Sequence, residues 1–327
     1  MHKKIFLVTG VAGFIASKVA ALLLADGHRV IGLDNFEDHY RRLKEYRLDW
    51  VSKQAGAENF SYLHKSVGDR NALENIFISE KIDAVIHLAA RAGVRQSLEE
   101  PAAYMETNAS FFFVLLEAMH RHGVAKLVLA STSSMYAGQS APFSEDLPAD
   151  KPLSPYAVSK RAAELAAYNY HKLYDFDVAI LRYFTVFGPA GRPDMSVFRF
   201  IQDICLARPI RIFGDGKQVR DFTYVDDIAR GTVAAAVTPS GFEIINLGGG
   251  SPMMLNDMIA GIERVLKKKA ERIFVAAHAA DMEATGADIS KAARLLAWRP
   301  MVAADEALRA TVCWHLKNHA WITQEGL

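Results

Sequence analysis

An apolar run followed by a glycine turn opens the chain and restricts its fold more than any other feature. Residues 5–8 read Ile-Phe-Leu-Val, and Thr9-Gly10-Val11-Ala12-Gly13-Phe14-Ile15 comes directly after them. This order is typical of a buried parallel strand, a tight turn and the start of a helix. Gly10 permits the turn, and Gly13 lets the backbone approach a pyrophosphate. That anion would bind the free N–H groups at the start of the helix, where Phe14 and Ile15 lie.

An acidic residue follows at the distance that a dinucleotide site requires. A helix over about residues 14–25 and a second apolar strand lead to Asp34-Asn35. An acid about 20 residues beyond the glycines is where the ribose hydroxyls of an adenosine bind. Asp34 would repel a 2′-phosphate, so the pattern favours NAD over NADP, although Arg41 and Arg42 nearby keep NADP open.

Two further segments are candidates for the same cofactor. Asp69 offers a carboxylate to the adenine amino group, and the apolar strand at 84–87 ends in Leu88-Ala89-Ala90. Small side chains there would let the diphosphate lie against the loop. A histidine within an apolar strand is usually a hydrogen-bonded core group, so we interpret His87 in that way.

A tyrosine and a lysine four residues apart, Tyr156 and Lys160, follow a hydroxyl run at 131–134, which reads Ser-Thr-Ser-Ser. On a helix, this spacing places both side chains on one face. A phenol with a pKa of about 10 needs roughly 4 kcal/mol of phenolate stabilisation to act as a base near neutral pH. Nearby cations acting through an effective dielectric of about 20 can supply that. Tyr156 would then move a proton, with Lys160 as cation and Thr132 as orienting hydroxyl, while a nicotinamide moves a hydride. An ordinary surface pair on a helix is the alternative.

Composition narrows the class of protein. The chain has 327 residues, 51% of them hydrophobic, and a net charge of +1. These values predict a globular protein and no general nucleic-acid surface. No apolar run is long enough to span a bilayer, and no signal-peptide pattern opens the chain, so we expect a cytoplasmic protein without membrane attachment. Cys205 and Cys313 lack metal-ligand spacing, and we expect no metal site.

Strand and helix patterns alternate to about residue 185, which predicts an α/β fold with a doubly wound, Rossmann-like parallel sheet. After that point the elements shorten and loops become common. We therefore expect a cofactor domain over residues 1–187, to which 223–250 returns. Residues 188–222 and 251–327 would form a smaller C-terminal substrate-binding lobe.

Several motifs together resemble the extended short-chain dehydrogenase/reductase family, and within it the NAD-dependent epimerases and dehydratases. They are Thr9-Gly10-x-x-Gly13, His87-Leu88-Ala89-Ala90, Thr132, Tyr156-x-x-x-Lys160, and Arg-Asp-Phe-Thr-Tyr-Val-Asp-Asp at 220–227. The segments at 92–97 and 184–195 are most similar to those of UDP-glucuronate 4-epimerases. The resemblance covers nearly the whole chain.

The resemblance implies a reaction. Tyr156 would take the proton of the sugar's 4-hydroxyl while C4 gives hydride to tightly bound NAD. The 4-keto sugar would turn over, and the hydride would return to its opposite face, which interconverts UDP-glucuronate and UDP-galacturonate. Asn108 would support the cofactor site, and Arg220 would bind the UDP diphosphate. The other residues implied in substrate binding are Arg95, Ser133, Ser134, Thr185, Arg192 and Asp281.

Arg192 is the residue that would select the substrate. A hydrogen bond to a charged group is worth roughly 1.5–3 kcal/mol, so an arginine facing C6 would favour a carboxylate. A surface turn around Gly-Arg-Pro is the alternative. Ser133-Ser134 stand where related dehydratases have Asp-Glu, which argues against dehydration. A UDP-glucose or UDP-N-acetylhexosamine 4-epimerase, a UDP-glucuronate decarboxylase and a non-catalytic NAD-sensing scaffold stay open.

Two helical segments bear on assembly. Residues 101–122 and 155–174 have apolar faces that in this family pack between two subunits, so we expect a homodimer. Packing inside one subunit would explain the same faces. The first segment also departs from the family, because Asn108 is followed by Ala-Ser-Phe-Phe instead of the usual glycine and threonine.

Overall fold

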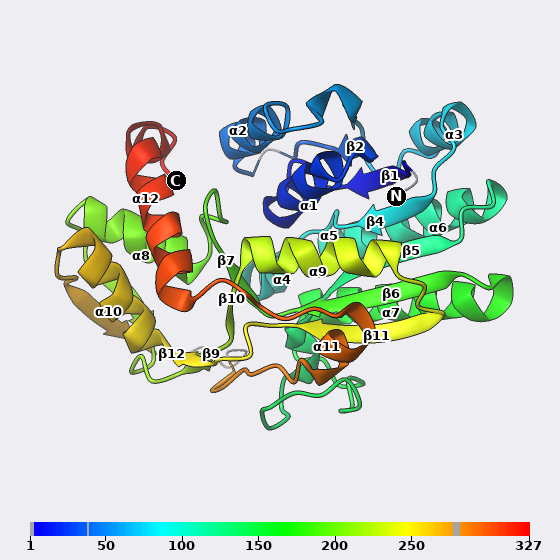
Figure 1. Cartoon of the computed structure of the whole chain (residues 1–327). Coiled ribbons are helices and arrows are strands. Elements are labelled where there is room, and N and C mark those ends of the chain that lie inside the picture. The colour runs from blue at the N-terminus through cyan, green and yellow to red at the C-terminus, as the bar shows by residue number, and fades with distance from the viewer. Residues whose placement is uncertain (1–2, 38, 277–281) are drawn as a thin grey trace.

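A seven-stranded parallel sheet forms the centre of the molecule (Figure 1). The computed structural model describes residues 3–37, 39–276 and 282–327. The strand order is β11-β6-β5-β4-β1-β2-β3. The strands are β1 (Ile5–Thr9), β2 (Arg29–Asp34), β3 (Phe60–His64), β4 (Ala84–His87), β5 (Lys126–Thr132), β6 (Asp177–Tyr183) and β11 (Phe242–Leu247). The chain order reverses between β1 and β4, and ligands of such sheets bind in the crevice at this switch point. The predicted doubly wound sheet is confirmed.

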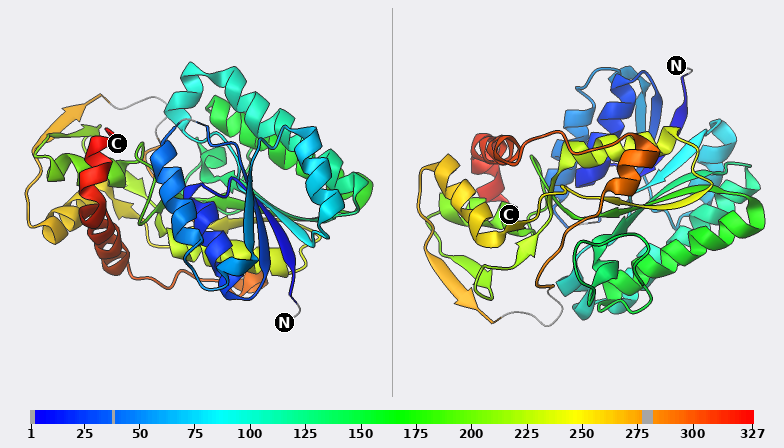
Figure 2. Two further views of the ribbon diagram at one scale, coloured as in Figure 1. Left: turned by 90° about the horizontal axis from the view of Figure 1, so that it is seen from above. Right: turned by 60° about the horizontal axis from the view of Figure 1, so that its bottom comes forward.

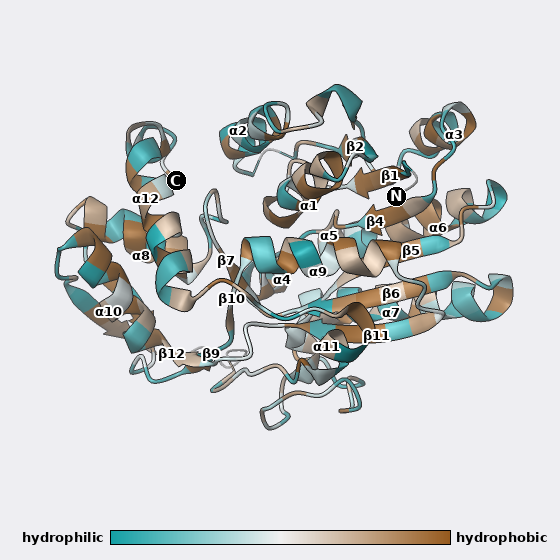
Figure 3. Cartoon of the chain, viewed as in Figure 1, coloured by the Kyte–Doolittle hydropathy of each residue, from teal (hydrophilic) through white to brown (hydrophobic). Residues whose placement is uncertain are grey.

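Helices cover both faces of the sheet, because its strands are apolar on both sides. One face carries α1 (Phe14–Ala25), α2 (Arg41–Val51), α9 (Val225–Val237) and α11 (Ser290–Leu296). The other carries α3 (Arg70–Ser79), α6 (Phe111–Arg121) and α7 (Pro155–Tyr174). Figure 3 shows the strands coloured as hydrophobic between these layers. Each face therefore has its own apolar core.

A smaller lobe lies beside the carboxyl ends of the strands (Figure 2). Its apolar core is formed largely by the helices α8 (Ser196–Cys205), α10 (Leu255–Leu266) and α12 (Ala304–Gln324). Its short strand pairs are β8 (Ile210–Phe213) with β13 (Arg272–Val275), and β9 (Val219–Arg220) with β12 (Met253–Met254). A third pair, β7 (Thr185–Phe187) with β10 (Phe222–Tyr224), leads from the sheet into the lobe.

Segments from both parts of the sequence contribute to each structural unit. The strand β11 pairs with β6, and α9 packs on α1. The helix α11 also belongs to the core on the sheet, although we expected residues 251–327 together in the lobe. The domain limits stay a prediction.

The expected helix over 101–122 is interrupted. The chain forms α5 (Pro101–Met105), a π-helical turn at Glu106–Ser110 and then α6. Beyond this turn the Phe112 ring stacks on His87 with a centroid distance of 4.8 Å. Of the unusual residues after Asn108, Ala109 and Ser110 thus fall on a π turn, an irregularity that is common at functional sites, and the two phenylalanines open α6. None of the described helices has both the length and the apolarity needed to cross a membrane.

Candidate active site

The glycine turn after β1 lies directly against the turn after β4. Gly10 has φ +71°, and a Cβ atom there would lie 2.8 Å from the Ala89 backbone. A Cβ atom on Gly13, which precedes α1, would lie 2.7 Å from the Gly10 oxygen. Phe14 and Ile15 open the helix, with the Phe14 ring buried in the lobe core. Only glycine leaves the helix N-terminus bare of side chains here, as a pyrophosphate site needs.

The acidic residues expected around the adenosine are engaged with backbone N–H groups. Asp34 accepts hydrogen bonds from Ala12 at 3.1 Å and Phe36 at 2.9 Å. Its carboxylate therefore also shapes the glycine turn. Asn35 accepts a hydrogen bond from the Glu37 N–H group at 3.2 Å. Asp69 caps α3 by accepting from Ala72 at 3.0 Å, and this bond lowers the pKa of Asp69.

The turn after β4 is held from two sides. The Ala89 N–H group donates to the Thr9 hydroxyl at 3.2 Å, and the Leu88 N–H group to the Thr9 carbonyl at 3.3 Å, while Ala90 is exposed. Asn108 accepts from the Arg91 N–H group at 2.8 Å and donates to the Arg91 carbonyl at 2.9 Å. A third bond joins the Asn108 amide to Ser159 on α7 at 2.9 Å. Asn108 is therefore a buried clamp between this turn and the tyrosine helix.

Tyr156 lies in the first turn of α7, whose N-cap is Ser154. Its phenol is close to Thr132, which ends β5, and to the guanidinium of Arg192. Burial raises the pKa of Tyr156, whereas the hydrogen bond with Thr132 and the charge of Arg192 act to lower it. The Thr132 hydroxyl also accepts from the Ser134 N–H group at 3.1 Å, which holds the turn at Ser133–Tyr136 in place.

Lys160 follows one helical turn later and is 3% exposed. Burial lowers the pKa of Lys160 to about 8, and the nearby Glu164 opposes this effect. Across from it, burial and the charge of Lys160 lower the pKa of His87 to about 3. The neutral His87 ring hydrogen-bonds the Thr9 hydroxyl at 2.8 Å. This supports our interpretation of His87 as a core group.

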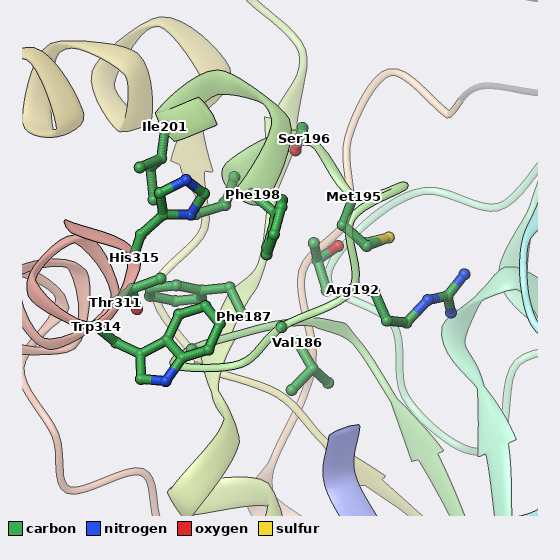
Figure 4. A pocket seen from close by; sticks show the side chains of 14 residues that line it. Val186, Phe187, Arg192, Met195, Ser196, Phe198, Ile201, Thr311, Trp314 and His315 are labelled. Atoms are coloured by element: carbon green, nitrogen blue, oxygen red, sulfur yellow. The ribbon is translucent and has the colours of Figure 1, made fainter. Parts of the chain in front are cut away.

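Arg192 and Thr185 line one pocket between the sheet and the lobe, together with Trp314 of α12. Figure 4 shows that Arg192 extends away from the aromatic side chains of Phe187 and Trp314. The Arg192 guanidinium forms an ion pair with Asp194, with Nε 3.0 Å from Oδ1. It also donates to the Ala92 carbonyl at 3.0 Å. Arg192, which we expected to bind a substrate carboxylate, is thus already paired with the carboxylate of Asp194.

The remaining substrate candidates lie on other elements. Arg95 is on α4 (Val94–Glu99), and its guanidinium lies 3.7 Å from the ring centroid of Phe213 on β8. Arg220 is on β9 and donates to the Val219 carbonyl at 2.8 Å. Ser133 is buried beside Thr132. Asp281 lies outside the described residues.

Three residues to which the sequence analysis assigned no role organise this site. Glu164 hydrogen-bonds both Arg182 of β6 and Ser131 of β5. Arg47 of α2 is 5% exposed and donates to the Ala12, Ala190 and Gly191 carbonyls. It thereby joins the glycine turn to the loop of Arg192. No local pattern marks these contacts, because their partners are distant in sequence.

The residues at the carboxyl edge of the sheet fit a dinucleotide. The Gly10 and Gly13 cradle is closed to any Cβ atom, and the Lys160 ammonium has no hydrogen-bond partner among the residues that the structure describes. Glu164 is a nearby anion, but the ammonium still lacks a hydrogen-bond acceptor, which the hydroxyl or carbonyl oxygens of a ligand would supply. Asp34 at the tip of β2 completes the arrangement.

The model of the NAD dependent epimerase/dehydratase family matches residues 6–248. The chain belongs to this family. A UDP-glucuronate 4-epimerase of Thermodesulfobacterium geofontis (strain OPF15) is 54% identical over 315 residues, which cover 96% of each chain.

Solved structures of family members have the same fold. A UDP-glucuronic acid 4-epimerase from Bacillus cereus, in complex with UDP-glucuronic acid and NAD, matches with a TM-score of 0.89 and 38% identity, over 96% of this chain and 99% of that one. A UDP-glucose 4-epimerase from Thermotoga maritima, with UDP-glucose, matches with a TM-score of 0.87 and 30% identity, over the same shares. The fold is thus common to epimerases of charged and neutral sugars, and the site must tell them apart.

Proposed function

We propose that this family member is an NAD-dependent UDP-sugar 4-epimerase that interconverts UDP-glucuronate and UDP-galacturonate. The observation that carries the proposal is the position of Arg192. Its guanidinium is near enough to Tyr156 to affect the phenol's pKa, and it shares a pocket with Thr185. A sugar whose 4-hydroxyl meets Tyr156 would therefore bring its C6 substituent toward a cation. The Thermodesulfobacterium geofontis and Bacillus cereus relatives support this substrate.

NAD would be held by the edge of the sheet. The cradle of Gly10 and Gly13 would take its pyrophosphate, Asp34 would bind its adenosine ribose, and Lys160 would bind its nicotinamide ribose. When bound, NAD accepts a hydride from C4 of the sugar and returns it. The other residues proposed on the cofactor are Phe14, Ile15, Asn35, Asp69, Leu88, Ala89, Ala90 and, through its clamp on the Arg91 turn, Asn108.

Tyr156 moves the proton in this proposal. Burial keeps its pKa high, which suits a phenol that must also return the proton. The hydrogen bond with Thr132 and the charge of Arg192 act to lower that pKa, and Lys160, one helical turn along α7, is proposed as a further cation for the phenolate. Thr132 keeps the 4-oxygen in reach of the phenol in both directions of the reaction.

Arg192 also bears on a side reaction. Oxidation of C4 in a glucuronate gives a β-keto acid, which loses carbon dioxide when the breaking bond aligns with the carbonyl π system. Arg192, with Thr185, Ser133 and Ser134, would hold the carboxylate out of that alignment. Arg95 and Arg220 would bind the nucleotide part, as would Asp281.

One observation favours a second candidate, an epimerase of neutral UDP-sugars. Asp194 already pairs with Arg192, and a hydroxymethyl group at C6 would leave that ion pair intact. The test is to incubate the purified protein, without added cofactor, with UDP-glucuronate, UDP-glucose and UDP-N-acetylglucosamine separately, and to identify the sugars by NMR. We expect conversion of UDP-glucuronate, and conversion of only the neutral sugars would overturn the proposal.

We also propose a homodimer formed through α6 and α7. Phe113 on α6 and Val158 and Leu165 on α7 are exposed apolar side chains. Apolar patches on a protein surface commonly mark a contact with another chain. Light scattering after gel filtration should give twice the chain mass, and Leu165→Glu should give the monomer. A monomeric wild type would overturn this arrangement. The cytoplasmic location stays a prediction from the sequence.

A further inference from the structure

Glu164 is a buried carboxylate that the proposed chemistry does not use. It lies on α7 and is 1% exposed. Its Oε1 atom accepts from Ser131 Oγ at 2.6 Å and from Arg182 Nε at 3.0 Å, and its Oε2 atom accepts from Arg182 Nη2 at 2.8 Å. A buried carboxylate is costly unless such bonds surround it. Its place next to the active site therefore calls for an explanation.

The partners of Glu164 lie on the elements that carry the catalytic candidates. Ser131 directly precedes Thr132 at the end of β5, and it faces Arg182 across the β5–β6 register. The Arg182 guanidinium also lies 4.9 Å from the ring centroid of Tyr136, in the turn that follows Thr132. One carboxylate thus joins α7 to both strands at the point where the proton-transfer groups meet.

Titratable groups on three elements surround Lys160. Glu164 and Tyr156 lie on the same helix, His87 ends β4, and Arg182 lies on β6 behind Glu164. Burial would raise the pKa of Glu164, but its bonds to Arg182 and Ser131 hold it below the ordinary value. His87 is neutral, so Glu164 is the anion that offsets the positive charge of Lys160.

We propose that Glu164 is a positioning residue of this active site. Held by Arg182 and Ser131, it fixes the Thr132 end of β5 against the helix turn of Lys160 and keeps Lys160 positively charged. The role of Lys160 as the cation beside Tyr156 rests on the proposed function. The contribution of Glu164 goes beyond it.

Glu164→Gln keeps the shape of the side chain and removes its charge. We expect the alkaline limb of the kcat profile to move to lower pH by about one unit, because Lys160 then loses its proton more easily. Glu164→Asp keeps the charge, so its limb should stay in place. Arg161→Gln is the matched control: Arg161 bonds the same carboxylate at 2.9 Å, but from a partly exposed position. Its limb should also stay in place.

A double variant, Glu164→Leu with Arg182→Met, separates positioning from folding, because apolar replacement of a buried ion pair is often tolerated. We expect its melting temperature to be close to that of the wild type. The alkaline limb of its kcat profile should still be shifted to lower pH. The proposal would be overturned if the alkaline limb stayed at its wild-type pH in both Glu164→Gln and the double variant. NAD retained after gel filtration between pH 7 and 9 is the second readout, and Glu164→Gln should lose it at lower pH than the wild type. If the wild type converts no UDP-sugar, the proposed function fails. The pH dependence of NAD retention in Glu164→Gln and the wild type then decides this inference by itself.

Discussion

At the scale of single residues, the surroundings of Tyr156 favour the protonated phenol unless further positive charge lies close to it. Burial raises the pKa of the phenol, whereas the hydrogen bond with Thr132 and the charge of Arg192 act to lower it. An oxidised nicotinamide would add a further positive charge at this point. Proton release would then accompany the oxidised state of the cofactor, as an epimerase requires.

Tyr156→Phe removes the proton carrier and little else. General acid–base groups contribute about 10²- to 10⁴-fold, so kcat should fall within that range. The dissociation constant for UDP-glucuronate, measured by calorimetry, should change little. Tyr174→Phe, an exposed tyrosine near the end of the same helix, is the control and should leave both values unchanged. Full turnover in Tyr156→Phe would contradict this role.

Arg192→His tests the contact to the substrate carboxylate. We expect the KM for UDP-glucuronate to rise about ten- to a hundredfold, and a UDP-pentose by-product to appear in NMR spectra. The KM for UDP-glucose should not follow. Arg199→Gln, exposed on the neighbouring α8, is the matched control. An unchanged KM and product ratio would mean that Asp194, not the substrate, is the true partner of Arg192.

At the scale of elements, the sequence was sufficient to predict a helix where residues next to its start mark it. Gly13 before α1 made that helix predictable, and the spacing of Tyr156 and Lys160 with the apolar face of residues 155–174 made α7 predictable. The break at Asn108 was not predictable, because it depends on hydrogen bonds to Arg91 and Ser159 from other parts of the chain. The same holds for the bonds of Glu164 to Ser131 and Arg182, which lie on other elements of the folded chain.

Gly10→Ala tests the turn between β1 and α1. The added Cβ would meet the Ala89 backbone at 2.8 Å in a residue with φ +71°. We expect a loss of about 1–3 kcal/mol in the free energy of unfolding and little NAD after purification. Gly123→Ala is the matched control, since it has φ +69° and open space around the new Cβ. It should keep its NAD, and equal NAD content in both variants would contradict a cofactor cradle at Gly10.

At the scale of the whole molecule, contacts of α2 join the sheet to the lobe next to the site. Trp314 of α12 donates to the Tyr46 hydroxyl of α2 at 2.8 Å, and Arg42 pairs with Glu325 at 2.9 Å. Arg47 adds a link from α2 to the Arg192 loop. The cofactor and substrate halves of the proposed site are thus held together by contacts of α2 with the C-terminal segment and with the Arg192 loop.

The lobe should lose stability in mild acid. His315 of α12 is 1% exposed and donates to Gln202 at 2.7 Å. Burial, with a smaller effect from His319, lowers the pKa of His315 to about 4. Because the unfolded chain binds this proton near pH 6.5, stability falls as pH drops from 6.5 toward 4. The loss at pH 5 should be about 2 kcal/mol.

Urea unfolding at pH 7 and pH 5 measures this loss, with His315→Gln as the comparison. The difference between the two pH values should be about 2 kcal/mol smaller in the variant than in the wild type. Equal differences would show that folding does not lower the pKa of His315.

The central claim is that one bound NAD takes the hydride from C4 and returns it to the same carbon. UDP-glucuronate carrying deuterium at C4 tests this directly, with the purified protein and no added cofactor. We expect NMR to show UDP-galacturonate that retains its deuterium at C4. Product with hydrogen at C4, or UDP-pentose alone, would contradict the account.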